Sequence, residues 1–178
     1  MSPDSRTLLM TRGDISRTIQ RMGLEIKRDY EGKSPLLVGV LKGSFIFLSD
    51  LVREICIPLT VDFVQAQSYV STESTGQVSI ESGSLSRLRD RHVLIVEDIV
   101  DTGTTIAQLM ALFQAEHPAS LKLCSFLDKP YCRDVPVKVD YLGITVPNKF
   151  VVGYGMDLDQ EHRYLPDLWV IEDDGSSP

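Results

Sequence analysis

The chain has 178 residues, of which 43% are hydrophobic and 24% are charged, and its formal net charge is −7. A chain of this length can bury enough apolar surface to fold unaided, so we expect residues 1–178 to form one domain. The negative charge disfavours a nucleic-acid-binding protein. No apolar run approaches the roughly 20 residues needed to cross a bilayer, which disfavours a membrane protein.

The cysteines and the two ends of the chain indicate a cytoplasmic protein. Cys56, Cys124 and Cys132 are odd in number and include no Cys-x-x-Cys pair, which is typical of a reduced compartment. Residues 1–6 are polar and lack the apolar core of a signal peptide. Residues 172–178 are acidic and polar, and we expect them to form a disordered tail.

A helix, a strand and a second helix are predicted in the first third of the chain. Apolar residues at helical spacing predict an amphipathic helix over residues 14–30. Residues 36–41 are an apolar run typical of a buried strand, and the turn Lys42-Gly43-Ser44 follows directly. Residues 45–55 return to helical spacing. This order places a helix N-terminus, with a lysine beside it, at one edge of a sheet.

A polar segment follows the next predicted strand. Residues 59–64 are extended in character, and Ser68 and Tyr69 then precede a polar stretch that predicts a mobile hairpin over about residues 69–83. This hairpin is either a solvated loop or a lid that excludes water from a reactive intermediate. Composition alone does not separate these two interpretations.

The stretch from Val93 to Thr105 carries the strongest functional signal. Its four leading aliphatic residues predict a strand buried on both faces, and Glu97 and Asp98 end that strand. The turn Asp101-Thr102-Gly103-Thr104-Thr105 then opens a helix. Such a turn offers free backbone N–H groups and a helix dipole to a phosphate. Carboxylates beside it suit ribose hydroxyls or a divalent cation, so the stretch predicts a sugar phosphate site.

The last third of the chain adds four predicted strands. Residues 121–127 are apolar and end in Asp128-Lys129-Pro130, and extended runs follow at 139–144, at 149–157 and at 168–171. Repeated alternation of strands and helices predicts an α/β fold with a parallel central sheet flanked by helices. Ligands of such sheets bind at the carboxyl ends of the strands. There we expect a shared cleft lined by Lys42, Glu97, Asp98, Asp101, Lys129 and Phe150.

The 93–105 stretch resembles the phosphoribosyl-diphosphate (PRPP) motif of the phosphoribosyltransferases. It lacks the glycine and Gly-Lys spacing of a phosphate-binding Walker loop and the repeated glycines of a dinucleotide site. Further segments occur in the same order as in the hypoxanthine-guanine phosphoribosyltransferases, and the chain resembles that family from about Leu36 to Ile171. These segments are Val40–Ser44, Ser68-Tyr69, Ser74–Gly76, Leu127–Pro130 and Phe150–Asp157.

The resemblance implies a fold, an activity and its partners. It implies a phosphoribosyltransferase fold with a small hood, formed from the chain termini, and the hairpin as lid. It implies purine salvage, in which hypoxanthine or guanine and PRPP give IMP or GMP plus pyrophosphate, with Mg²⁺ as cofactor. A homodimer or homotetramer is expected, with no nucleic acid or membrane as partner.

The resemblance also implies roles for residues around the sugar phosphate. The backbone and hydroxyls of the 101–105 turn, which comprises Asp101, Thr102, Gly103, Thr104 and Thr105, would hold the 5′-phosphate. Glu97 and Asp98 would bind the ribose hydroxyls and one Mg²⁺. Lys42 and Gly43 would meet the pyrophosphate, with a peptide between them that can be cis, and Arg163 would bind the same leaving group. Ser68 and Tyr69 would contact substrate from the lid.

On the purine side, the implied roles divide between recognition and chemistry. Lys129 would donate to the exocyclic O6, which selects oxopurines over aminopurines. Phe150 would stack on the base, and the backbone of Val151 and Asp157 would read its far edge. The Asp157 side chain would help to bind a second Mg²⁺. The implied catalytic residues are Lys129, Arg163 and Asp101, and Asp101 would handle the N7 proton.

Two alternatives and one departure remain open in the sequence. A xanthine-guanine phosphoribosyltransferase would share Lys129, and the sequence does not show how the purine 2-position is read. A non-catalytic regulator of the same fold, which binds RNA, would need a basic surface that the net charge of −7 disfavours. Residues 158–162 are acidic where many relatives carry aromatic residues near Arg163.

Overall fold

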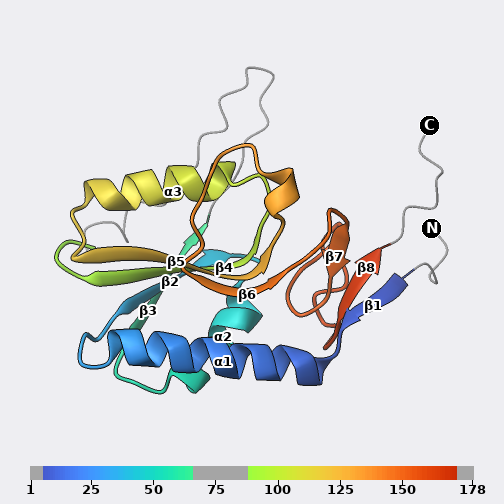
Figure 1. Cartoon of the computed structure of the whole chain (residues 1–178), viewed down its shortest axis with the longest axis horizontal. Helices are drawn as coiled ribbons and strands as arrows, with labels where there is room; N and C mark the ends of the chain where they lie inside the picture. The colour runs from blue at the N-terminus through green and yellow to red at the C-terminus, as the bar shows by residue number, and fades with distance from the viewer. Residues whose placement is uncertain (1–5, 66–87, 172–178) are drawn as a thin grey trace.

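The structure is a computed structural model that describes residues 6–65 and 88–171 (Figure 1). The predicted hairpin over residues 69–83, with Ser68 and Tyr69, lies outside the described residues, as does the predicted tail over residues 172–178. Within the described ranges, no helix combines the length and the apolar character that a membrane span requires.

A five-stranded parallel sheet forms the centre of the fold. Its strands, in spatial order, are β3 (Thr60–Gln65), β2 (Leu36–Leu41), β4 (His92–Val100), β5 (Ser120–Asp128) and β6 (Tyr141–Thr145). The middle strand, β4, pairs with β2 on one side and with β5 on the other. Its residues Val93 to Val96 are fully buried, which explains why they read as one continuous aliphatic run.

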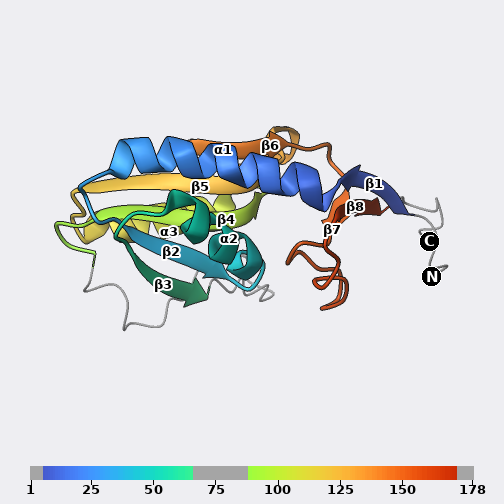
Figure 2. The same ribbon diagram turned by 90° about the horizontal axis from the view of Figure 1, so that it is seen from below.

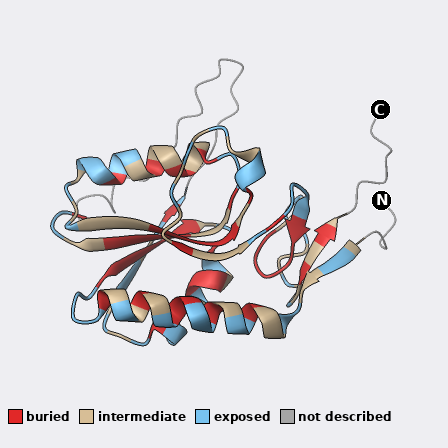
Figure 3. Ribbon diagram, in the orientation of Figure 1, coloured by how far each residue is buried: buried red, intermediate tan, exposed pale blue. Residues whose placement is uncertain are grey.

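Helices cover both faces of this sheet. The helices α1 (Arg12–Tyr30) and α2 (Phe45–Ile55) lie on one face, and α3 (Thr104–Ala115) lies on the other (Figures 1 and 2). Each helix turns its apolar stripe toward the sheet, so that two separate clusters of buried side chains form (Figure 3). A reciprocal capping box between Thr11 and Asp14 starts α1, two residues before the predicted helix.

A small antiparallel sheet forms the predicted hood at one end of the molecule. It contains β1 (Arg6–Met10), β8 (Leu168–Ile171) and β7 (Phe150–Val152) in that spatial order. Figure 1 shows this small sheet beyond the N-terminal end of α1, beside the carboxyl ends of the central strands. The sequence did not reveal β1, because its pattern of Arg-Thr-Leu-Leu-Met has neither polar-apolar alternation nor a long apolar run.

The hood touches the central domain through backbone. A Cβ atom added to Gly155 would lie 2.6 Å from the carbonyl oxygen of Gly43, so the loop after β7 packs directly on the turn between β2 and α2. The Tyr154 hydroxyl donates a hydrogen bond of 2.6 Å to Asp50 of α2. Burial and this carboxylate raise the Tyr154 pKa, so the phenol stays protonated and continues to donate.

Candidate active site

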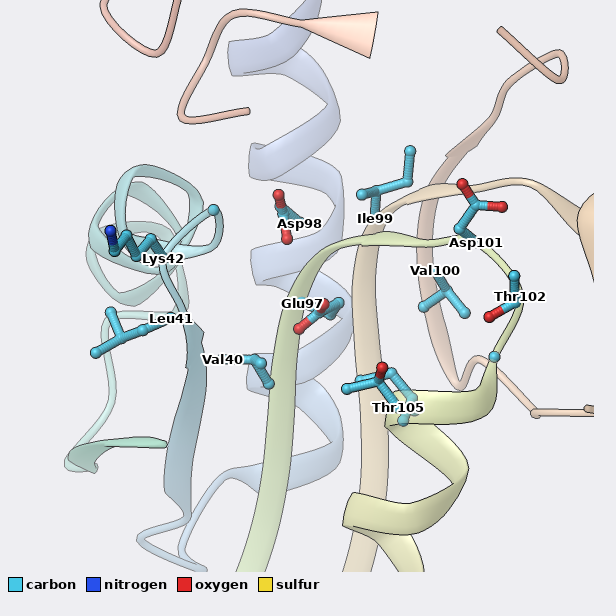
Figure 4. A pocket seen from close by; sticks show the side chains of 13 residues that line it. Val40, Leu41, Lys42, Glu97, Asp98, Ile99, Val100, Asp101, Thr102 and Thr105 are labelled. Carbon is cyan, nitrogen blue, oxygen red and sulfur yellow. The ribbon is translucent and has the colours of Figure 1, made fainter. Parts of the chain in front are cut away.

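A pocket of about 250 Å³ lies at the carboxyl ends of β2 and β4, beside the first turn of α3 (Figure 4). It contains eight of the predicted site residues, which come from two turns and from the end of β4. These are Lys42, Gly43, Glu97, Asp98, Asp101, Thr102, Gly103 and Thr105. The ninth residue of this region, Thr104, begins α3 directly beside the pocket.

The turn between β4 and α3 leaves backbone donors open. Gly103 is the N-cap residue of α3 and has a φ of 85°, a left-handed conformation that favours glycine. Because glycine has no side chain, Gly103 offers no side-chain cap to the first N–H groups of α3, and the Thr104 N–H donates over a long 3.4 Å to the Thr102 hydroxyl oxygen. Hydroxyl groups of Thr102 and Thr105 stand beside them in the pocket. Open amides, hydroxyls and a helix dipole together form an anion site.

Gly103 also permits close packing beneath the turn. A Cβ atom added there would overlap the carbonyl oxygen of Val135 and lie 2.9 Å from Cδ of Arg133. The chain after β5 therefore passes directly under the phosphate-binding turn. The N–H groups of Asp134 and Val135 donate to the Thr102 carbonyl over 2.9 Å and 3.1 Å.

Glu97 and Asp98 lie between the two turns (Figure 4). Burial raises the pKa of Glu97 well above its ordinary value, and the neighbouring Asp98 charge raises it further. Burial also raises the pKa of Asp98, to about 6. A buried carboxyl oxygen of Glu97, Oε2, has no hydrogen-bond partner among the described residues. Both acids are therefore suited to hydroxyl donors or to a cation, which would satisfy the oxygen and neutralise the charge.

This acid pair fits Mg²⁺ that is held mainly through substrate. Within the described residues, no three acidic, histidine or cysteine side chains converge as a complete metal site. Mg²⁺ usually keeps several water ligands and binds through one or two carboxylates plus substrate oxygens. The pair of acids with an unpartnered buried oxygen meets that requirement.

The turn between β2 and α2 is closed by its own polar groups. Ser44 is fully buried, and its hydroxyl donates to the Val40 carbonyl over 2.7 Å. A Cβ atom added to Gly43 would overlap the carboxylate of Asp98, which explains the glycine. The peptide between Leu41 and Lys42 is cis, whereas the prediction placed a possible cis bond between Lys42 and Gly43. The sequence left this point open, because neither bond precedes a proline and the sequence holds no signal for either.

The loop after β7 brings Arg163 and Asp157 to the same pocket edge. Arg163 pairs with Asp157 over 2.5 Å and donates to the Gly155 carbonyl over 2.7 Å. The charges of Arg163 and Asp157 both act on the pKa of Asp98, which places all three close together. Gln160 joins this group, because its side-chain oxygen accepts from Nζ of Lys42 over 3.3 Å.

Gln160 is a residue that the sequence reasoning missed. Its backbone N–H donates to Asp157 over 2.8 Å, so it links that carboxylate to Lys42 across the pocket edge. Nothing in the sequence marks it, since a glutamine in a polar loop resembles any solvated residue.

Lys129 stands next to the phosphate-binding turn, at the end of β5. It is 6% exposed, and its Nζ donates to Asp101 over 3.2 Å. The Lys129 N–H donates to the Val100 carbonyl, which fixes the lysine beside β4. Nζ also lies 5.9 Å from the centre of the Phe150 ring, and that ring is 60% exposed. An exposed aromatic face beside a buried lysine can hold a flat polar heterocycle.

Val151 and the rest of β7 border this aromatic face. Among the described strands, β7 pairs only with β8, so its other edge offers backbone groups to a ligand. The Val151 side chain itself is buried in the core. Any contact of this residue with a ligand would therefore be made by its backbone.

Comparisons with known proteins identify the family. Residues 11–159 match the family model described as phosphoribosyl transferase domain. A hypoxanthine-guanine phosphoribosyltransferase of Streptococcus pneumoniae is 39% identical over 172 residues, which cover 96% of each chain.

Solved structures agree with this result. A hypoxanthine phosphoribosyltransferase of Staphylococcus aureus superposes with a TM-score of 0.89 at 38% identity, covering 97% of this chain and 94% of that one. A hypoxanthine-guanine phosphoribosyltransferase of Bacillus anthracis gives a TM-score of 0.85 at 36% identity, covering 93% and 98%. The chain therefore belongs to the phosphoribosyltransferase family, and within it to the hypoxanthine-guanine phosphoribosyltransferases.

Proposed function

We propose that the chain transfers the 5-phosphoribosyl group of PRPP to hypoxanthine or guanine. The observation that carries this proposal is one contact, between Asp101 and Lys129, which links the predicted phosphate site to the predicted purine site. Asp101 belongs to the phosphate-binding turn, and it pairs with Lys129, which lies beside the exposed Phe150 ring. A sugar phosphate and a purine bound at these two sites therefore meet at Asp101.

The sugar phosphate is held by groups of three kinds. The open amides and hydroxyls of the 101–105 turn bind the 5′-phosphate. Glu97 and Asp98 accept hydrogen bonds from the ribose hydroxyls, which satisfies the buried oxygen of Glu97. Lys42 and Arg163 bind the pyrophosphate, and Arg163 offers it a planar fork of donors. To do so, Arg163 exchanges part of its pairing with Asp157 for the ligand.

The purine is selected by Lys129. Its ammonium group donates to the O6 atom of an oxopurine, whereas the amino group of adenine would present a donor to a donor. A buried site left with such a mismatch rejects the wrong ligand strongly. Phe150 stacks on the base, and the backbone of Val151 and Asp157 contacts its far edge.

In the reaction, the bond between the anomeric carbon and a pyrophosphate oxygen breaks, and a bond to a purine ring nitrogen forms. Asp101 takes the proton that the purine releases at N7, while Lys129 holds the purine through O6 and through its own contact with Asp101. Lys42 and Arg163 stabilise the charge that develops on the pyrophosphate. Glu97, Asp98 and Asp157 would hold Mg²⁺, which would supply further positive charge to the phosphate oxygens.

One assay tests the proposal directly. PRPP and Mg²⁺ are incubated in parallel with hypoxanthine, guanine, xanthine and adenine, and nucleotide formation is measured. We expect turnover of hypoxanthine and guanine and little or none of adenine. Turnover of xanthine above that of hypoxanthine would favour the xanthine-guanine alternative, and no turnover of any purine would refute the proposal.

The variant Lys129→Gln tests the O6 contact. Because an amide can accept as well as donate, we expect kcat/KM for adenine relative to hypoxanthine to rise by about 10-fold or more. Lys138→Gln is the matched control, since Lys138 is exposed and pairs with Asp140 away from the pocket. Unchanged relative kcat/KM values in the Lys129 variant would refute the contact.

We further infer a homodimer or homotetramer located in the cytoplasm. Phe45 at the start of α2 and Val61 and Phe63 of β3 are each more than 40% exposed, which supports a partner on this side of the sheet. All three cysteines of the chain lie in described segments and none forms a disulfide, which supports a reduced compartment. Light scattering on the purified protein would measure the assembly.

A further inference from the structure

Arg133 forms a largely buried ion pair that the proposed chemistry does not use. Its guanidinium pairs with Asp128, the last residue of β5, and each of the two side chains is only 13% exposed. The Asp128 carbonyl accepts from the Val146 N–H over 2.9 Å, so this residue is fixed on its β6 side as well. Asp128 lies opposite Val100 in the pairing of β4 with β5 and directly precedes Lys129.

The other side of Arg133 lies against the phosphate-binding turn. Its Cδ atom would be 2.9 Å from a Cβ atom added to Gly103. The next two residues, Asp134 and Val135, both donate through their N–H groups to the Thr102 carbonyl. Arg133 therefore stands between the strand end that presents Lys129 and the turn that presents the phosphate site.

Stability alone is a poor explanation for this arrangement. A buried ion pair loses much of its hydration, and an apolar pair of similar volume is often as stable or more stable. The Nη1 atom of Arg133 is buried without a hydrogen-bond partner among the described residues, which adds a further unfavourable contribution. A charged fork with fixed geometry, however, specifies position more sharply than an apolar contact does.

We propose that Arg133 is a positioning residue for the transfer reaction. Held by Asp128, it fixes the phosphate-binding turn relative to Lys129, so that the sugar phosphate and the purine are presented to each other at the correct separation. This inference rests on the proposed function. It predicts that loss of the pair changes substrate geometry even when the fold is intact.

The test compares Arg133→Met with the double variant Asp128→Asn/Arg133→Met. The single variant leaves a buried unpaired carboxylate, and we expect a lower Tm together with a lower kcat/KM for PRPP. The double variant removes both charges, and we expect Tm to return toward that of the unchanged protein. Its kcat/KM should nevertheless stay roughly 10- to 100-fold low, with KM for PRPP raised and kcat lowered, because small displacements of bound groups cost this much.

Two further variants complete the experiment. Arg133→Lys keeps the charge without the planar fork and should recover only part of the kcat/KM. Lys138→Met removes an exposed lysine that pairs with Asp140 in the same segment and should leave the kinetics unchanged. Recovery of full kcat/KM in the double variant would overturn the proposal, because the residue would then only compensate a buried charge.

A binding measurement separates this proposal from the proposed function. Calorimetry with ribose 5-phosphate reports on the phosphate-binding turn without any purine. In the double variant we expect its Kd to rise about 10-fold at an unchanged Tm. An unchanged Kd would overturn the role of Arg133, whereas an unmodified chain that turns over no purine would refute the function and leave this binding result standing.

Discussion

Two neighbouring strand, turn and helix units of this molecule are proposed to bind different parts of the same substrate. The β2–α2 corner and the β4–α3 corner follow adjacent parallel strands, and each contains one glycine in its turn. In the β4–α3 corner, Gly103 offers α3 no side-chain cap, and the Thr104 N–H donates over 3.4 Å to the Thr102 hydroxyl oxygen. In the β2–α2 corner, α2 likewise begins without a side-chain cap hydrogen bond, because the Ser44 hydroxyl donates to the Val40 carbonyl, and Lys42 adds a cation to the pocket.

The difference shows how one supersecondary unit acquires two functions. A helix N-terminus beside hydroxyls and without a cationic side chain suits a phosphate that stays bound throughout the reaction. A lysine beside a helix N-terminus suits a group that must bind, gain charge and leave. What distinguishes the corners is therefore the cation, which Lys42 adds to the β2–α2 turn and which no residue of the 101–105 turn supplies.

The largest expected effect concerns the β4–α3 corner. Asp101→Asn keeps the shape of the turn but removes the proton acceptor, so we expect kcat to fall by roughly 10²–10⁴ while PRPP still binds. Steady-state kinetics and PRPP calorimetry would measure both quantities. A near-normal kcat would show that this corner only binds phosphate and that the acid-base group lies elsewhere.

The two glycines should respond differently to the same substitution. Gly103→Ala places a Cβ atom against the Val135 carbonyl at a φ of 85°, so we expect unfolding free energy to fall by about 2–4 kcal/mol. The nearest atoms that Gly43→Ala would meet belong to the Asp98 carboxylate, a side chain that can rotate away. Its stability should change by less than about 2 kcal/mol.

For Gly43→Ala, the main loss should instead be in catalysis. Displacement of Asp98 disturbs the ribose contact, and we expect kcat/KM for PRPP to fall by about 10². Denaturant unfolding and steady-state kinetics on both variants would distinguish the two cases. Equal losses of stability would show that the corners are restrained in the same way.

The acids between the corners predict a pH dependence of the ligand-free protein. The Asp98 pKa is raised from 3.8 to about 6, so the folded state binds more protons than the unfolded state in that window. Stability therefore decreases as pH rises from about 4 to about 6, by on the order of 2 kcal/mol. Glu97, with its pKa raised in the same direction, extends the decrease upward.

Denaturant unfolding in magnesium-free buffer between pH 4.5 and pH 7.5 would measure this slope, and Asp98→Asn should reduce it. Asp29 does not contribute to this slope. A hydrogen bond from Tyr141 lowers the pKa of that carboxyl, so its contribution to stability is lost only at lower pH. A slope that is identical in Asp98→Asn and in the unchanged protein would contradict the prediction.

The smallest expected effects come from one hydroxyl in each corner. Thr105→Val removes a group that lines the pocket, and we expect KM for PRPP to rise about 5- to 10-fold with little change in Tm. Ser44→Ala removes the buried hydrogen bond to Val40, and we expect about 1 kcal/mol less stability with KM nearly unchanged. A loss of stability in Thr105→Val and a raised KM in Ser44→Ala would contradict the roles given to the two corners.

Local signals made much of this molecule predictable. The aliphatic runs at 36–41 and 93–96 identify central strands because burial on both faces leaves no room for polar alternation. The phosphate-binding turn was equally readable, since it needs only consecutive residues. The placement of Lys129 beside Asp101 followed from the rule that carboxyl ends of parallel strands share one edge.

Features that depend on distant partners were not predictable. The strand β1 is specified by its pairing with β8, about 160 residues later, rather than by its own sequence. Gln160 gains its place from Lys42 and Arg133 from its packing on the turn at Gly103, and each would pass for a surface residue in isolation. The cis peptide before Lys42 has no sequence signal because no proline follows Leu41.

Because β1 pairs with β8, the small sheet that contains both strands can form only after the last strand has been synthesised. The strands β2 to β5, with both corners and Lys129, are synthesised before any residue of β7 or β8 exists. Throughout that time β1 lacks the only strand with which it pairs in the described structure. Translation thus delivers the proposed phosphate site first and Phe150, which is proposed to stack on the base, late. Quality control of nascent chains would meet an unpaired N-terminal strand until the last strand emerges.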